Sequence, residues 1–127
     1  MNKEDLKSKI SKASYIVTQE HGTEAPFSGE LLDTKEEGIF TCVCCGNELF
    51  SSDTKYDSGT GWPSFWDVLN ENSVGEEIDK SHGMIRTEVH CQKCSAHLGH
   101  LFPDGPMPTG KRYCMNSVAM QFKKSDK

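Results

Sequence analysis

Hydrophobic residues are sparse in the first third of the chain and recur at helical spacing only near its start. Leu6, Ile10 and Ala13 are separated by charged and polar residues, which predicts a short amphipathic helix over Lys3–Ala13. The stretch Thr18–Glu37 is mostly polar and contains two glycines and a proline. This composition indicates an irregular segment that wraps around the rest of the domain.

From Gly38 onward the pattern changes to short hydrophobic or alternating runs separated by turn residues, which is typical of short β-strands. We predict strands over Gly38–Cys42, Glu48–Ser51, Val74–Ile78, Met84–His90, His97–Phe102, Arg112–Asn116 and Ala119–Lys123, and one helical turn over Trp66–Asn70. The expected fold is mainly β, a sandwich or a partly open barrel, with a short N-terminal helix.

The length of 127 residues fits one domain, which we divide into an N-terminal segment over 1–37 and a β core over 38–123. Lys and Arg number 14 against 19 Asp and Glu, so the net charge is -5 and a nucleic-acid partner is not expected. No apolar run is long enough to span a bilayer, and the first residues lack the apolar region of a secretory signal. We therefore expect a cytoplasmic protein without a membrane partner.

Six cysteines in a cytoplasmic chain indicate metal binding or catalysis rather than a disulfide framework. Four of them form two Cys-x-x-Cys motifs, Cys42 with Cys45 and Cys91 with Cys94. Two such motifs supply the four thiolates of a closed tetrahedral Zn²⁺ site, and a closed site is structural because it leaves no position for substrate. A redox pair and an iron–sulfur centre are the alternatives.

Two cysteines are not among these four expected ligands. Cys44 lies between two expected ligands, where it cannot reach the same metal. Cys114 stands alone, with Arg112 and Asn116 two residues to either side, so in a strand all three side chains share one face. A cation and an amide beside a thiol favour the thiolate. The alternative for a lone cysteine is a small buried hydrophobic residue.

Two further segments are rich in residues that bind or react. In His97–Pro106, His100 is a candidate proton donor, and Asp104 is a candidate to orient either His100 or Arg112. His82 is a weaker candidate. The segment Tyr56–Trp66 combines aromatic residues with glycines and a proline, which indicates either a core aromatic cluster or an aromatic pocket for a small apolar group.

Together these segments resemble the B-type methionine sulfoxide reductases, which act on the R epimer of the sulfoxide. The resemblance runs from about residue 12 to 122 and rests on the cysteine motif before Glu48–Phe50 and on the segments Ser58–Phe65, Ser81–Val89, His97–Pro106 and Arg112–Ser117. It implies two antiparallel sheets, with a structural zinc at one end, away from the active site.

The resemblance also implies the roles of individual residues. Cys114 corresponds to the nucleophile, Trp62 to the wall that receives the sulfoxide methyl group, and His100 and Asn116 to the groups that hold the sulfoxide oxygen and deliver protons. The substrate-binding or supporting positions that it implies are Phe65, His97, Asp104 and Arg112. A sulfenic acid on Cys114 must then be reduced by a second thiol.

Thr60 stands where one well-known version of the family has the resolving cysteine, the second cysteine that would form the disulfide. We therefore expect thioredoxin, glutaredoxin or a small thiol to reduce the sulfenic acid directly, with Cys44 as the alternative resolving cysteine. The expected substrate is methionine-R-sulfoxide, free or in oxidised proteins, and the expected protein is a monomer. A non-enzymatic zinc module that binds other proteins is the rival interpretation, although it leaves Cys114, His100 and Trp62 unexplained.

Overall fold

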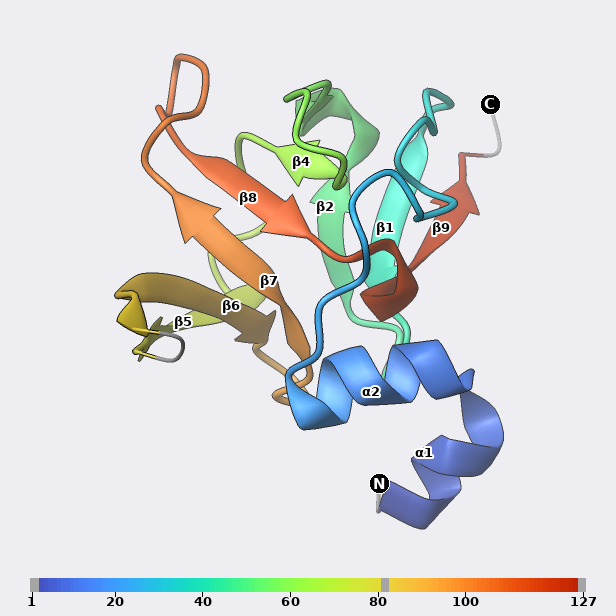
Figure 1. Cartoon of the computed structure of the whole chain (residues 1–127). Coiled ribbons are helices and arrows are strands. Elements are labelled where there is room, and N and C mark those ends of the chain that lie inside the picture. The colour runs from blue at the N-terminus through green and yellow to red at the C-terminus, as the bar shows by residue number, and fades with distance from the viewer. Residues whose placement is uncertain (1–2, 81–82, 126–127) are drawn as a thin grey trace.

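The structure is a computed structural model that describes residues 3–80 and 83–125, and its strands form two antiparallel sheets (Figure 1). The smaller sheet has the order β2 (Glu48–Ser51), β1 (Gly38–Cys42), β9 (Met120–Lys124). The larger has the order β3 (Lys55–Tyr56), β4 (Ser64–Phe65), β8 (Arg112–Met115), β7 (His97–Phe102), β6 (Arg86–Cys91), β5 (Val74–Asp79). The predicted mainly β fold with two antiparallel sheets is confirmed, as a sandwich and not as a closed barrel.

Aromatic side chains from the two sheets meet between them and form the centre of the core. Phe65 of β4 stacks on Phe50 of β2 at 4.3 Å between ring centroids, and its edge contacts Phe40 of β1 at 5.0 Å. Phe50 also contacts Tyr113 of β8 at 5.6 Å. The three phenylalanines are fully buried, so burial of their apolar surface holds the small sheet against β4 and β8.

The N-terminal segment folds as two helices, whereas the sequence predicted one helix over Lys3–Ala13. These are α1 (Lys3–Lys9) and α2 (Lys12–Glu20). The helix breaks because Ser11 adopts an extended conformation and its hydroxyl accepts a hydrogen bond from the backbone N–H of Ser14, which caps α2. Neither helix in the described part of the chain is long and apolar enough to span a membrane.

The helical turn predicted over Trp66–Asn70 is wrong. The backbone N–H of Trp66 donates to the carbonyl of Thr54, and that of Leu69 donates to the carbonyl of Leu49. These groups bond to distant segments instead of to residues four positions earlier, so the segment consists of bends.

The seven predicted strands are all present, with ends that differ from the prediction by at most two residues. The sequence missed β3 and β4, which have two residues each and carry too little periodicity to be recognised. Short 3₁₀ helices in the described part of the chain include η1 (Ser52–Thr54) and η3 (Ser117–Ala119). The candidate His82 and its neighbour Ser81 lie outside the described residues.

Phe65→Ala is expected to lower the free energy of unfolding by about 3–5 kcal/mol, because it leaves a cavity where the two sheets meet. Urea denaturation measures this change. Phe27→Ala is the matched control, since Phe27 is 70% exposed, and its expected effect is within about 0.5 kcal/mol. Equal effects of the two substitutions would contradict the position of Phe65 in the core.

Candidate functional site

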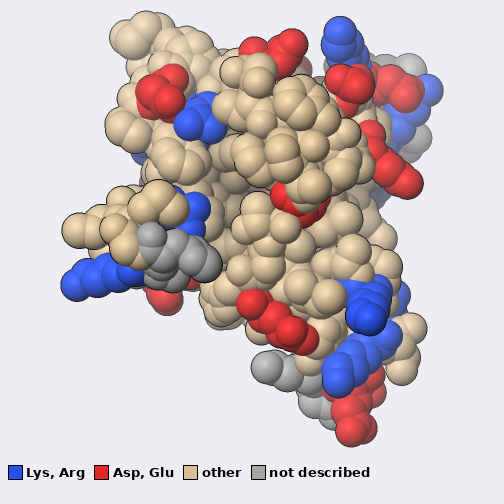
Figure 2. Space-filling view, in the orientation of Figure 1, with Lys and Arg blue, Asp and Glu red and all other residues tan. Residues whose placement is uncertain are grey.

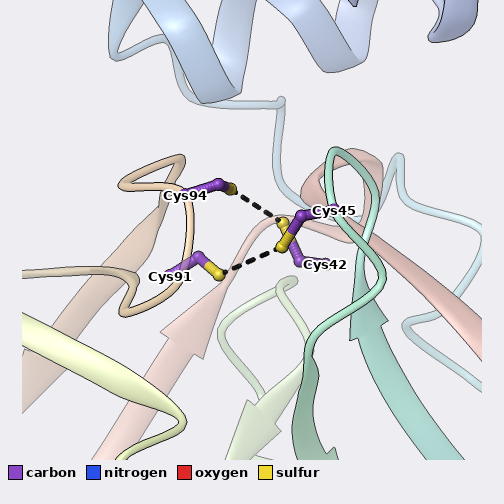
Figure 3. Close-up of side chains that lie close together, drawn as sticks. All are labelled: Cys42, Cys45, Cys91 and Cys94. Atoms are coloured by element: carbon purple, nitrogen blue, oxygen red, sulfur yellow. Dashed lines mark hydrogen bonds between the residues drawn. The ribbon is translucent and has the colours of Figure 1, made fainter. Parts of the chain in front are cut away.

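The four cysteines of the two Cys-x-x-Cys motifs lie together, as the sequence predicted (Figure 3). One motif occupies the turn between β1 and β2, and the other the turn between β6 and β7. The Sγ atoms of Cys42 and Cys94 are 3.6 Å apart, as are those of Cys45 and Cys91. Left-handed residues close both turns, Gly46 at φ 78° in the first and Ser95 at φ 66° in the second.

The sulfur positions suit a tetrahedral metal ion. Sulfur ligands at about 2.3 Å from Zn²⁺ are roughly 3.8 Å apart, close to the observed spacing and far longer than a disulfide bond. A hydrogen bond from the Cys42 thiol lowers the pKa of Cys91 and favours the thiolate form that binds metals. Cys44 lies outside the cluster, buried below α2, where its Sγ is 3.5 Å from the Thr18 hydroxyl.

A second feature is a cavity of about 250 Å³ that opens on the larger sheet. Its lining brings together residues far apart in sequence: Thr60, Trp62, His100, Arg112, Cys114 and Asn116. Arg86 also lines it, and among the described residues none of the lining side chains is acidic. In the space-filling view, basic side chains lie above and below a hollow in this face (Figure 2).

Cys114 is half-buried in β8, between the neighbouring strands β4 and β7. The register pairs it with Ser64 on one side and His100 on the other. Burial raises the pKa of the Cys114 thiol, and the Arg112 guanidinium and the Thr60 hydroxyl counteract this only in part. Arg112 therefore favours the thiolate as the sequence predicted, but desolvation is the larger effect and the resting thiol is protonated at neutral pH.

Arg112 is held at the cavity by two contacts. Its guanidinium donates two hydrogen bonds to the Asp104 carboxylate, at 2.8 Å and 3.2 Å. The same group lies 4.3 Å from the centroid of the Phe102 ring. Asp104 therefore orients Arg112, one of the two roles considered for it, and does not line the cavity.

His100 is oriented by an acidic residue that the sequence did not indicate. Its Nε2 lies 2.9 Å from the Asp79 carboxylate on β5, two strands away from β7. His97, in contrast, does not line this cavity and is 2% exposed. Its Nδ1 lies 2.8 Å from Glu88, and its ring packs edge-on against His100 at 5.4 Å. His97 therefore lies outside the cavity and contacts it through His100.

The backbone of Glu24, in the segment after α2, joins Trp62 to Asn116. The Trp62 indole N–H donates to the Glu24 carbonyl at 2.9 Å, and the Glu24 N–H donates to the Asn116 side-chain carbonyl at 2.9 Å. The Asn116 amide donates to the carbonyl of Leu98 at 2.9 Å. Asn116 and Trp62 are therefore fixed relative to each other through a segment that was predicted only to be polar and irregular.

The position of Phe65 contradicts the prediction that this residue binds substrate. Its side chain is fully buried among Phe40 and Phe50 and does not line the cavity. The physical reason is strand alternation. Ser64 pairs with Cys114 and Phe65 pairs with Tyr113, so the side chains of Phe65 and Cys114 lie on opposite faces of the sheet.

Comparison with known proteins identifies close relatives over nearly the whole chain. The family model of the SelR domain matches residues 10–124. A peptide methionine sulfoxide reductase MsrB from Hahella chejuensis is 54% identical over 123 residues, which cover 97% of this chain and 88% of that protein. One from Escherichia coli O45:K1 is 55% identical over 119 residues, which cover 94% and 87% of the two chains.

A solved structure with a different sequence has a similar fold. The crystal structure of the Mis18 'Yippee-like' domain matches with a TM-score of 0.58 at 19% sequence identity. The match covers 72% of this chain and 100% of that chain. At this identity the likeness concerns the fold alone.

The thiol of Cys114 is expected to titrate above the ordinary cysteine pKa of about 8.5, because burial disfavours its charged form. Its alkylation by iodoacetamide, followed by peptide mass spectrometry, should therefore accelerate as pH rises through this elevated pKa. Arg112→Met should raise the apparent pKa further, whereas Lys111→Met, which removes an exposed neighbouring charge, should change it less. An apparent pKa below that of free cysteine, or equal shifts in both variants, would contradict this description.

Proposed function

Because this chain belongs to the SelR domain family, we propose that it reduces methionine-R-sulfoxide to methionine, with Cys114 as its nucleophile. One observation carries this proposal. The cysteine that stands apart from the metal cluster opens into a small cavity that also presents the Trp62 indole and the His100 imidazole. A reactive thiol, an apolar wall and a proton donor are the groups that this reaction requires.

The cavity matches the chemistry of a methyl sulfoxide. The Trp62 ring offers an aromatic surface to the methyl group and to sulfur. The sulfoxide oxygen carries partial negative charge, and the cavity contains Arg86 and Arg112 without an acidic lining residue among those described. We propose that the oxygen faces His100 and Asn116. The Asn116 amide has a second N–H besides the one donated to Leu98.

In the proposed reaction, Cys114 gives its thiol proton to solvent, and its sulfur attacks the sulfoxide sulfur to form a sulfur–sulfur bond. The protonated oxygen leaves the substrate sulfur as hydroxide and bonds to the Cys114 sulfur, and the sulfur–sulfur bond breaks. The substrate sulfur gains two electrons and leaves as methionine, while Cys114 loses two electrons and becomes a sulfenic acid. The leaving oxygen needs a proton. The imidazolium form of His100 carries two N–H groups, so Asp79 can accept one while the other serves as the acid.

Hydrogen bonds fix three of the cavity side chains, those of Trp62, Asn116 and Arg112. Glu24 holds Trp62 and Asn116 through its backbone, and Asp104 holds Arg112. We propose that Arg112 stabilises the Cys114 thiolate, because its guanidinium opposes the effect of burial on the thiol.

Recycling requires a thiol from outside the chain. In the proposed step, this thiol displaces the hydroxyl of the Cys114 sulfenic acid as water and forms a mixed disulfide, which a second thiol of the reductant opens. Thr60 occupies the cavity and cannot form a disulfide, and Cys44 is buried below α2 beside the metal cluster. These positions support thioredoxin, glutaredoxin or a small thiol as the reductant, and argue against Cys44.

We propose Zn²⁺ as the ion of the four-cysteine cluster. The four sulfur ligands and their spacing suit this ion, and they leave no position for substrate. Its proposed role is to join the β1–β2 turn to the β6–β7 turn. The monomeric state, the cytoplasmic location, the use of free or protein-bound sulfoxide and the lack of nucleic-acid or membrane partners stay predictions.

Single-turnover reduction of the separated R and S sulfoxides, without added reductant, tests the proposed function. The wild type should release about one equivalent of methionine from the R epimer alone, because one cysteine accepts one oxygen. Cys114→Ser should lose more than roughly 10³-fold of this activity, as expected for removal of a nucleophile.

Two controls accompany this experiment. Cys44→Ala should keep full single turnover and should sustain many turnovers with thioredoxin; arrest after one turnover would identify Cys44 as the resolving cysteine. No methionine from either epimer, from folded metal-loaded protein, would instead favour a zinc module without catalytic activity.

Cys94→Ser should lose the bound metal and destabilise the fold by on the order of several kcal/mol, since the free energy of metal binding is also folding free energy. Cys94 is exposed, so the substitution itself removes no core packing. Metal analysis and thermal unfolding measure both effects. Cys44→Ser is the matched control and should retain its metal. A metal-free Cys94→Ser protein with wild-type stability would refute the structural role.

A further inference from the structure

A second group of metal-binding side chains lies outside the cysteine cluster and outside the proposed reaction. His21, Glu88 and His97 each offer a ligand atom, and these atoms lie within 4.8 Å of one another. The Nε2 of His21 is 3.0 Å from Oε1 of Glu88, and the Nδ1 of His97 is 2.8 Å from the same oxygen. The three residues come from the end of α2, from β6 and from β7.

The His97 imidazole is buried, and Glu88 satisfies its Nδ1 but not its Nε2. His97 is 2% exposed, and its Nε2 has no hydrogen-bond partner among the described residues. Buried nitrogen atoms without a partner are rare, because they lose their hydration without compensation. Burial also lowers the pKa of His97 and favours the neutral imidazole, which is the form that binds metal ions.

The surroundings leave the group open on one side. His21 is largely exposed, with a relative side-chain accessibility of 68%, and a cavity of about 260 Å³ adjoins the three residues. Water molecules in this cavity can complete the coordination of an ion held by three protein ligands. Asp79, Lys80 and Arg86 line the cavity as well, and Arg86 forms an ion pair with Asp79 at 3.4 Å.

The position of His21 also favours a cation. This residue caps the C-terminus of α2, a helix of nine residues, where the helix dipole presents partial negative charge. Its backbone has φ 55°, a left-handed conformation that is uncommon for residues other than glycine. In this conformation its imidazole reaches over to Glu88, and the His21 and His97 rings are 5.1 Å apart.

We propose that His21, Glu88 and His97 form a second metal site, open to solvent, for a divalent transition-metal ion such as Ni²⁺ or Zn²⁺. Two imidazoles and a carboxylate are suitable ligands for ions of this class. Ligand atoms at about 2.0–2.2 Å from the ion lie roughly 3.0–3.5 Å apart. The distances from the Glu88 oxygen to His21 and to His97, 3.0 Å and 2.8 Å, differ from this spacing by about half an ångström or less, and the two imidazole nitrogens lie within 4.8 Å of each other. The proposal does not depend on the reductase function.

Calorimetric titration of the zinc-loaded full chain with Ni²⁺ tests the site. The wild type should bind about one equivalent, and His21→Gln should weaken this binding by at least roughly tenfold, because it removes one of three ligands. His21 is exposed, so the substitution leaves the core intact. His90→Gln is the matched control. His90 lies on β6, the strand that also holds Glu88, and is not part of the proposed metal site. Its substitution should therefore leave Ni²⁺ binding unchanged.

Glu88→Gln is a second variant with nearly the same side-chain volume, and it should weaken Ni²⁺ binding without unfolding the chain, as checked by circular dichroism. Zinc release is followed with a colorimetric chelator during the titration. The proposal is overturned if the wild type binds no Ni²⁺, if His21→Gln keeps wild-type affinity, or if both histidine variants lose affinity equally. Ni²⁺ uptake matched by release of an equal amount of zinc would assign the ion to the cysteine cluster and would also overturn it.

Discussion

Antiparallel pairing of β7 with β8 places His100 directly opposite Cys114, and the geometry of the cavity depends on this register. Gly99, next to His100, makes the close approach of the strands possible. A Cβ atom at this position would lie 2.1 Å from the carbonyl oxygen of Cys114. A shift of the register by one residue would turn Cys114 toward the aromatic core and Tyr113 toward the cavity. The core therefore enforces the register, since it buries Tyr113 and excludes a polar side chain.

The polar segment after α2 completes the cavity from outside the sheets. It contributes no strand, yet the two backbone groups of Glu24 bind Trp62 and Asn116. The carboxylate of Glu24 accepts a further hydrogen bond from the backbone N–H of Val118, at 3.1 Å. Hydrogen bonds to buried groups are costly to lose, so these bonds hold the aromatic wall of the cavity in place.

The six cysteines lie in three different environments, which their spacing along the chain does not by itself predict. Four share a cluster in which the close thiols favour metal binding, and Cys44 is buried beside that cluster without joining it. Cys114 lies where burial raises its pKa and a guanidinium opposes that effect. In our proposals, cysteine sulfur therefore has a structural role at the two turns and a chemical role at the centre of the larger sheet.

The sequence alone determined the features that depend on local pattern: the seven principal strands, the two Cys-x-x-Cys motifs and the family resemblance, from which we expect Cys114 to be the nucleophile. Only the tertiary structure decided which side chains meet across strands. It paired His100 with Asp79, joined Trp62 to Asn116 through Glu24, brought His21 to Glu88 and placed Phe65 in the core. The physical reason is that such contacts follow from strand register and burial over long sequence separations, while spacing along the chain reports only on neighbours within one element.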